Sequence, residues 1–343
     1  MRILIYSEGA TGKPDEGIRK FCQGLVEGLQ KTGAEVLLLS GPETRGRQSL
    51  WSRLEVNLHS LAPSLGGKIR RFHPDLLLYI PTASLTLPSF IRGILLAKWG
   101  KEVPFGWVGL QRGSTPHWSC EFPFPYGSYL LFISSEGIAP KGWRENGIRK
   151  IAGGVDLERF KPATPVERER IRRKYGINLD SFILLHVGHL VRNRNLNLLE
   201  RIQQFGKDQV LLIGSSSTER DGGVIQKLET SGISVFTSYI ENIEEVYRLS
   251  DCYLFPVTSP SASIEIPLSV LEAMATNLPV VTTKFGGLPD LFIERDGFFY
   301  AEEKEQFLIK IEEAKKHSTI KTRKMVLPYT WENVAKRILD AIQ

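Results

Sequence analysis

One stretch near the middle of the chain divides it into two halves: Gly153-Gly154-Val155-Asp156-Leu157-Glu158-Arg159-Phe160-Lys161-Pro162. Its paired glycines and its closing proline interrupt helix and strand patterns alike, as a linker does. The chain has 343 residues, and single hydrophobic cores stop growing at roughly 250–300 residues. We therefore expect two domains, with a boundary near Ala163.

The same alternation of apolar runs and helical patterns occurs on both sides of this stretch. Before it, a helix is expected at Gly17–Lys31, and the strand-like runs are Ile3–Tyr6, Ala34–Leu39, Leu76–Ile80, Phe105–Leu110 and Leu130–Ser134. After a charged helix at Val166–Tyr175, the strand-like runs are Phe182–Val187, Gln209–Ile213, Val235–Thr237, Cys252–Pro256 and Val280–Thr283. Strands separated by helices predict an α/β fold with two doubly wound, Rossmann-like domains. Ligands are expected in a cleft between the domains, at the carboxyl ends of the strands.

Composition and cysteine usage exclude several classes of protein. The chain is 42% hydrophobic and 24% charged, which is typical of globular domains. Its N-terminus shows no secretory signal, and no apolar run approaches the roughly 20 residues that cross a bilayer. Cys22, Cys120 and Cys252 are too scattered for a disulfide framework or a zinc site. We expect a cytoplasmic protein with buried thiols.

The positive charge lies in the first half of the chain. The net charge is +6, and Met1–Ala163 holds 21 Lys and Arg against 14 Asp and Glu. The basic clusters are Arg45, Arg47 and Arg53, and Lys68, Arg70 and Arg71. They suit an anionic membrane surface or a phosphate-bearing acceptor, and equally a solvated basic face. No nucleic-acid-binding pattern accompanies them, so nucleic acid is not an expected partner.

An acid on an apolar helix is the first candidate for binding chemistry. In Ile264–Ala275, Pro267 suits a helix start, and Glu272 follows in the second turn among apolar residues. A carboxylate in such surroundings needs hydrogen-bond donors, and a ribose diol provides two. We assign Glu272 to the ribose; pairing with a neighbouring base is the structural alternative.

Two glycine-containing loops suit a phosphate group. Gly286-Gly287 joins a strand to a helix, so backbone amides at a helix start approach an anion there. Gly188 ends the first strand of the second half, and Arg192 and Arg194 follow it. Fixed cations neutralise the charge of a departing diphosphate in the absence of a metal, and Arg194 is the best candidate. An exposed loop charge is the alternative for Arg192.

These segments together resemble glycosyltransferase family 4, a large family of retaining enzymes with the GT-B fold. Gly154–Pro162 is similar to its NGVDxxRFxP pattern, with Gly153 in place of Asn. Gly188–Asn195 is similar to GRLxxxKG, with His189 in place of Arg and Arg194 in place of Lys. Gly286–Asp290 is similar to GGxPE. The segment Tyr329–Glu332 resembles the start of the helix that crosses back to the first domain in this family.

The resemblance implies a division of labour between domains. Residues 1–163 form the acceptor-side domain, residues 164–328 bind the nucleotide-sugar, and residues 329–343 form the closing helix. The expected donor-binding residues are Gly188, His189, Arg192, Arg194, Tyr239, Leu268, Ser269, Glu272, Gly286 and Gly287. No metal and no cofactor are expected besides the nucleotide-sugar itself.

The chain departs from the family at two positions near the donor sugar. The family's first glutamate, eight residues before Glu272, is Ile264 here, and we expect Glu265 to substitute for it. The family's histidine after the fourth strand is Gln111 here, which leaves His117 as a candidate if its loop folds back. Gly17 belongs to the glycine-rich loop expected on the acceptor side.

The sequence therefore predicts a metal-independent, retaining glycosyltransferase that uses a UDP- or GDP-sugar and a sugar or lipid-linked hydroxyl acceptor. Its catalytic residues would be Arg194, Glu265 and His117. Because of the two departures, a non-catalytic nucleotide-sugar-binding or assembly subunit is the alternative. A sugar epimerase ranks last, since no acid and base side chains are evident for it.

Overall fold

The computed structural model describes residues 1–10, 12–13, 16–41, 62–82, 86–111, 128–132, 148–216, 221–317 and 319–342, with only the backbone at 128–132 and 148–150. The chain forms two compact units. The first unit comprises Met1–Gly154, Ile264–Ile266 and Trp331–Gln343, and the second comprises Val155–Ser263 and Pro267–Thr330. No helix in the described ranges has the length and apolarity needed to cross a bilayer.

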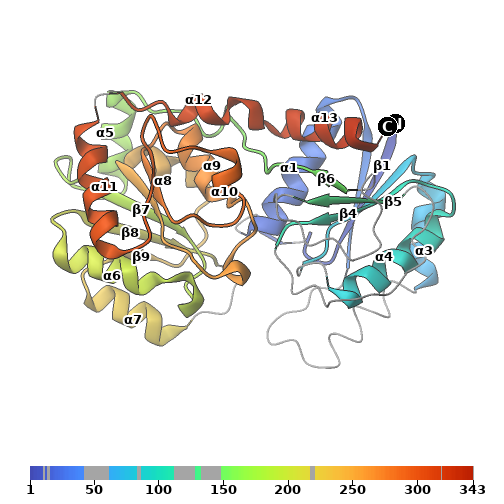
Figure 1. Ribbon diagram of the computed structural model, residues 1–343, viewed down its shortest axis with the longest axis horizontal. Helices are drawn as coiled ribbons and strands as arrows, with labels where there is room; N and C mark the ends of the chain where they lie inside the picture. Colours follow the sequence, from blue (N-terminus) through green and yellow to red (C-terminus); the bar gives the residue numbers. More distant parts are fainter. Residues whose placement is uncertain are drawn as a thin grey trace. The chain divides into compact units, whose positions relative to one another are not determined.

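The first unit is built on a parallel sheet (Figure 1). Its strands are β1 (Arg2–Ser7), β2 (Glu35–Ser40), β3 (Leu76–Tyr79), β4 (Phe105–Gly109), β5 (Ser128–Phe132) and β6 (Ile148–Lys150). Its helices are α1 (Gly17–Lys31), α3 (Pro63–Phe72), α4 (Leu87–Gly100) and α13 (Trp331–Ile342). The strand order is β2-β1-β3-β4-β5-β6, so it reverses direction between β1 and β3. Strand β6 was not predicted from the sequence.

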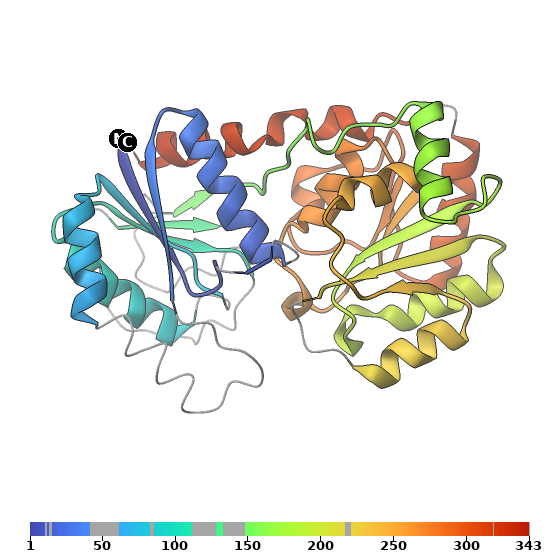
Figure 2. The same cartoon turned by 180° about the vertical axis from the view of Figure 1, so that it is seen from behind.

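Packing in the first unit follows the alternation of side chains along its strands. Leu4 and Tyr6 of β1 point to the face that α3 and α4 cover, where Trp107 completes the apolar core. Helix α13 packs on α1 (Figure 2), with the Trp331 and Phe21 rings 5.4 Å apart. A Cβ on Gly24 of α1 would overlap the Trp331 indole, so glycine is required for this close approach.

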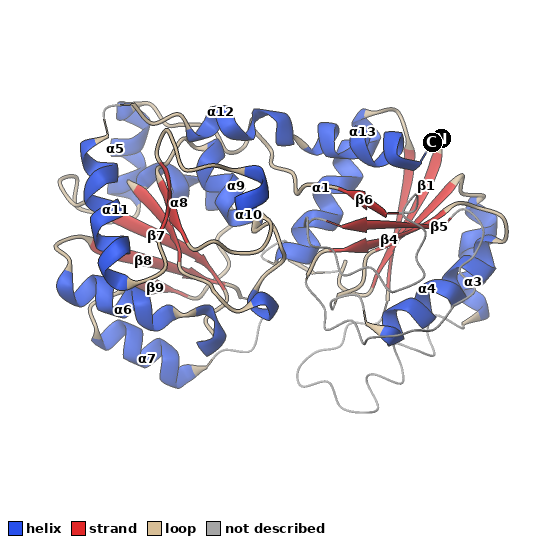
Figure 3. Cartoon of the chain, in the orientation of Figure 1, coloured by secondary structure: helices blue, strands red, loops and turns tan. Residues whose placement is uncertain are grey.

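The second unit repeats the architecture (Figure 3). Its strands are β7 (Ile183–Gly188), β8 (Gln209–Gly214), β9 (Ser234–Phe236), β10 (Cys252–Phe255), β11 (Val280–Thr282) and β12 (Phe298–Tyr300). Its helices are α5 (Pro165–Lys174), α6 (Leu196–Phe205), α7 (Gly222–Thr230), α8 (Ile243–Leu249), α9 (Leu268–Ala275), α10 (Leu288–Leu291), α11 (Lys304–Lys316) and α12 (Thr322–Val326). All strands are parallel, in the order β12-β11-β10-β7-β8-β9. The two doubly wound sheets expected from the sequence are confirmed.

From Val155 onward, the stretch that divides the sequence belongs to the second unit. The two units separate between Gly154 and Val155, whereas the sequence suggested Ala163. The Arg323 guanidinium donates a hydrogen bond of 2.8 Å to the carbonyl oxygen of Phe160, and the Phe160 ring packs in the same unit. Because these contacts hold the stretch in place, it is part of a domain as well as a connection.

Candidate functional site

The strand order of the second unit reverses between β7 and β10, and this is where open α/β sheets bind their ligands. Two residue pairs join these strands: Leu184 with Cys252, and Leu185 with Tyr253. The described pairing of the two strands ends there, before their carboxyl ends. The predicted donor-binding residues of the second half lie at or after these strand ends and that of β11, except for Tyr239, which follows β9.

The two arginines in the loop after β7 differ in their exposure to solvent. Arg192 lies on the surface, with a side chain 83% exposed that is ion-paired to Asp221. Residues Arg192–Arg194 form a short 3-10 helix. Arg194, its last residue, is only 6% exposed. Burial lowers the pKa of Arg194 to about 10, so it remains a cation at neutral pH. The predicted His189 is half-buried between the end of β7 and this turn.

Arg194 is a buried cation with no acidic partner in the described part of the chain. Its Nε makes no hydrogen bond to any described residue. Gly188 makes room for it, because a Cβ at this position would clash with a terminal nitrogen of the guanidinium. A buried, unpaired charge costs free energy unless an opposite charge binds beside it.

His186 lies close to Gly188 and Arg194. The sequence analysis did not predict it as a site residue. It is fully buried on β7, and its Nδ1 is 2.8 Å from the carbonyl oxygen of Leu254 on β10. Burial, together with the nearby charge of Arg194, lowers the pKa of His186 to about 4. Inside an apolar strand run a histidine shows no pattern that separates it from core residues.

Glu272 lies on α9 and is 4% exposed. The buried Tyr247 hydroxyl of α8 donates to its Oε2 at 2.7 Å. Ser269, in the first turn of α9, hydrogen-bonds the phenol of Tyr253 on β10. Leu268, the first residue of α9, is buried. Sequence reasoning missed both tyrosines, because each reads as an ordinary apolar position of its helix or strand.

Gly286 and Gly287 lie in the loop after β11, and Tyr239 lies in a different loop. Gly286 has φ of 55°, in the left-handed region that favours glycine. Gly287 is buried and immediately precedes α10. Tyr239 is half-buried in the loop between β9 and α8.

Glu265 belongs to the first unit together with Ile264 and Ile266, although the segments before and after these three residues belong to the second. Its backbone N–H donates to the Leu110 carbonyl oxygen at 2.7 Å, directly before the half-buried Gln111. The side chain of Ile264 lies 3.4 Å from the point that a Cβ on Gly17 would occupy. The structure thus brings together Gly17, Gln111 and Glu265, and Glu265 itself is 3% exposed. His117 lies outside the described residues.

A buried charged cluster marks the reversal point of the first sheet, between β1 and β3. Glu8 follows β1 and accepts hydrogen bonds from the Tyr79 hydroxyl at 2.5 Å and from the Thr82 N–H at 3.3 Å. The Arg92 Nε lies 2.9 Å from the same carboxylate. No sequence pattern indicated this cluster, since its members come from distant segments.

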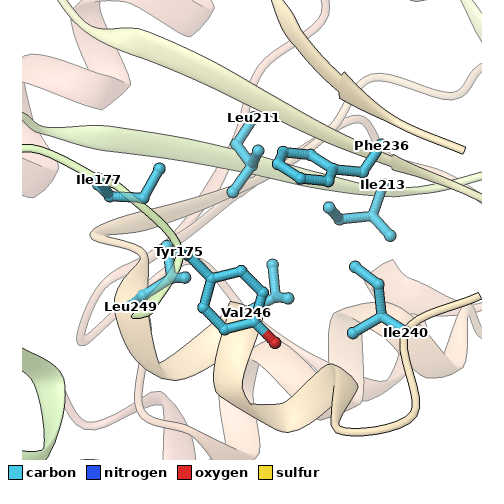
Figure 4. A pocket seen from close by; sticks show the side chains of 8 residues that line it. All are labelled: Tyr175, Ile177, Leu211, Ile213, Phe236, Ile240, Val246 and Leu249. Carbon is cyan, nitrogen blue, oxygen red and sulfur yellow. The ribbon is translucent and has the colours of Figure 1, made fainter. Parts of the chain in front are cut away.

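A small apolar pocket lies elsewhere in the second unit (Figure 4). It is lined by Tyr175, Ile177, Leu211, Ile213, Phe236, Ile240, Val246 and Leu249. Ligand sites usually contain a few precisely placed polar groups. This lining is apolar apart from the Tyr175 side chain, so it does not suit a nucleotide-sugar.

Comparisons with known proteins agree with this geometry. Residues 167–330 match the family model described as "Glycosyl transferases group 1". The chain is 24% identical over 337 residues to the sulfoquinovosyl transferase SQD2 of Arabidopsis thaliana. The aligned region covers 87% of this chain and 63% of that protein. The chain thus spans less than two thirds of that relative.

Two solved structures are similar over nearly the whole chain. A glycosyltransferase from Rickettsia africae has a TM-score of 0.76 at 17% identity, covering 99% of this chain and 97% of that one. HepE from Anabaena, in complex with UDP-glucose, has a TM-score of 0.73 at 19% identity, covering 100% and 99%. These likenesses confirm the GT-B class expected from the sequence.

Proposed function

We propose that the chain transfers a sugar from a nucleotide-diphosphate sugar to a hydroxyl acceptor. The match of residues 167–330 to the family model for glycosyl transferases group 1 supports this proposal. The observation that carries the proposal is Arg194, a buried cation without an acidic partner in the described ranges, at the reversal point of the second sheet. A diphosphate is the anion that suits this place. The UDP-glucose complex of HepE supports a donor of this class.

Glu272 binds the ribose in this proposal. The Tyr247 hydroxyl already satisfies one acceptor position of the Oε2 atom and fixes the direction of the carboxylate. A carboxylate has about four lone-pair positions, so it still accepts hydrogen bonds from a diol. The backbone amides of Gly286 and Gly287 face the diphosphate from the loop after β11.

The chemical step exchanges one bond at the anomeric carbon for another. The bond from this carbon to the phosphate oxygen breaks, and the acceptor oxygen bonds to the carbon from the same face, so the configuration is retained. The departing phosphate oxygen takes the acceptor proton. Arg194 neutralises the charge that develops on the diphosphate, which is the role a metal ion has in other transferases.

In this proposal Gly17 and Gln111 of the first unit lie on the acceptor side. The buried carboxylate of Glu265 orients a hydroxyl of the donor sugar, in place of the glutamate that the resembled family has where this chain has Ile264. A second candidate function is a non-catalytic nucleotide-sugar-binding subunit, because Ile264 and Gln111 stand where the resembled family has an acid and a histidine. Turnover of a donor would exclude this second function.

We also propose that the first unit contacts an anionic membrane. Lys68, Arg70 and Arg71 are exposed on α3, and the Arg70 guanidinium lies 5.1 Å from the centre of the Trp99 ring. Basic residues near an anionic surface each contribute roughly 1 kcal/mol of attraction. This face would bring the enzyme to lipid-linked acceptors.

The test is thermal stabilisation of the purified protein by UDP-, GDP-, ADP- and TDP-sugars, with EDTA present. A donor at 100 times its dissociation constant adds about 2.7 kcal/mol of stability. We expect one base to stabilise the wild type and Glu272→Ala to lose the effect, whereas Arg173→Met, altered at an exposed arginine of α5, keeps it. Stabilisation by none of the donors would refute the proposal, and binding without turnover on any acceptor would favour the non-catalytic function.

A further inference from the structure

The tautomer of His186 follows from its surroundings. A carbonyl oxygen only accepts hydrogen bonds, so the Nδ1 atom, 2.8 Å from the Leu254 carbonyl, carries the proton. The ring is fully buried, and its pKa is lowered to about 4 by burial. At neutral pH the imidazole is therefore uncharged, and its Nε2 is an acceptor without a proton.

His186 Nε2 and the guanidinium of Arg194 both lie next to Gly188. A Cβ on Gly188 would lie 3.2 Å from His186 Nε2 and would clash with a terminal nitrogen of Arg194. Neither His186 Nε2 nor Arg194 Nε has a hydrogen-bond partner among the residues that the structure describes. Two buried, complementary groups are thus side by side with unused bonding capacity.

A neutral partner suits a cation that must bind an anion. A carboxylate at position 186 would pair with Arg194, cancel its charge and compete with a phosphate. An imidazole directs the guanidinium through one N–H and leaves the whole charge available. The bond to Leu254 holds the ring in place between β7 and β10, beyond their paired residues.

We propose that His186 is a positioning residue: its Nε2 accepts one N–H of Arg194 when the diphosphate of the donor takes the others. The proposal rests on the proposed function, because it assumes that Arg194 binds the diphosphate. It adds a residue of the β7 strand whose effect on the ligand passes through Arg194. It also explains why a histidine occupies a strand interior that is otherwise apolar.

Two conservative variants separate the two ends of the ring. His186→Asn keeps a donor where Nδ1 lies, which preserves the bond to Leu254, but has no atom at the Nε2 position. His186→Gln places an amide oxygen near the Nε2 position and gives up the bond to Leu254. Arg194→Met removes the group on which His186 acts.

The experiment measures dissociation constants for UDP and uridine by calorimetry, or for GDP and guanosine if the donor panel selects that base. We expect His186→Asn to weaken UDP binding at least tenfold and to leave uridine binding within twofold. His186→Gln should stay within about threefold of the wild type for UDP. In an Arg194→Met background, His186→Asn should have no further effect, because a shared interaction is lost only once.

Each other outcome overturns the inference. Equal losses for UDP and uridine would show that His186 only supports the fold. Unchanged UDP binding in His186→Asn, with the Arg194→Met loss intact, would refute the role of His186 and leave the proposed function standing. Absence of binding by the wild type to any nucleoside diphosphate would refute both.

Discussion

Replacing Arg194 by methionine tests whether this buried cation destabilises the free protein in exchange for binding an anion. Burial lowers the pKa of Arg194 well below its ordinary value, to about 10. At 1.36 kcal/mol per pKa unit, this difference corresponds to about 3 kcal/mol of destabilisation. Methionine fills a similar volume without charge, so Arg194→Met should raise the free energy of unfolding by as much as this amount.

The sign and the pH range of this effect follow from linkage. The pKa of Arg194 is lower in the folded protein than in the unfolded chain. The destabilisation is therefore fully present below about pH 10 and is lost only as pH rises from there toward the pKa of the unfolded chain. The gain from Arg194→Met should therefore be constant between pH 6 and 8. Arg192→Met is the matched control in the same loop, since its side chain is 83% exposed, and a change within roughly 0.5 kcal/mol is expected.

The assay is urea unfolding followed by circular dichroism at pH 7.5, with and without UDP or the nucleotide that the panel selects. Without nucleotide, Arg194→Met should be more stable than the wild type. With nucleotide, the wild type should gain stability and the variant should not. A variant that is less stable than the wild type without nucleotide would refute the argument, because Arg194 would then have a compensating partner in the free protein.

The remaining predictions concern acid stability, domain packing and membrane contact. The pKa of His186 is lowered to about 4 in the folded protein. Between about pH 4 and pH 6.5 the unfolded chain therefore binds one more proton than the folded protein. The free energy of unfolding of the wild type should fall by about 2 kcal/mol from pH 7 to pH 5 for this reason. His186→Gln should lack this component in urea unfolding at the two pH values, and an identical loss in both proteins would contradict it. Trp331→Ala leaves a cavity over Gly24 and should cost about 3–5 kcal/mol, measured by the same method; a cost below about 1 kcal/mol would show that the helix contact is dispensable. Replacing Arg70 and Arg71 by Glu should weaken sedimentation with phosphatidylserine vesicles, and unchanged sedimentation would remove the argument for a membrane contact.

Much of the fold was predictable because it is encoded in local periodicity. The helix expected at Gly17–Lys31 has these bounds in the structure, and the strands ahead of Gly188 and Gly286 lie where the apolar runs placed them. Strands β6 and β12, of three residues each, were missed. Strands β9 and β11 are equally short and were predicted, because valines mark them, whereas two of the three residues of β6 are basic.

The site was predictable only in part, because burial depends on the whole fold. Arg192 and Arg194 stand two residues apart in one loop, and their letters do not tell which is exposed. Glu265 is adjacent to a helix of the second unit in sequence, yet it belongs to the first. His186 has no pattern at all.

By itself, the sequence determined that the chain forms two parallel α/β domains, that Glu272 lies on an apolar helix, and that glycines end the strands that precede candidate ligand loops. The tertiary structure decided the order of the strands, the burial of Arg194 and the meeting of His186 with it above Gly188. The physical reason is that backbone conformation depends mainly on neighbouring residues. The charge, hydration and bonding of a side chain depend instead on segments that only folding brings together.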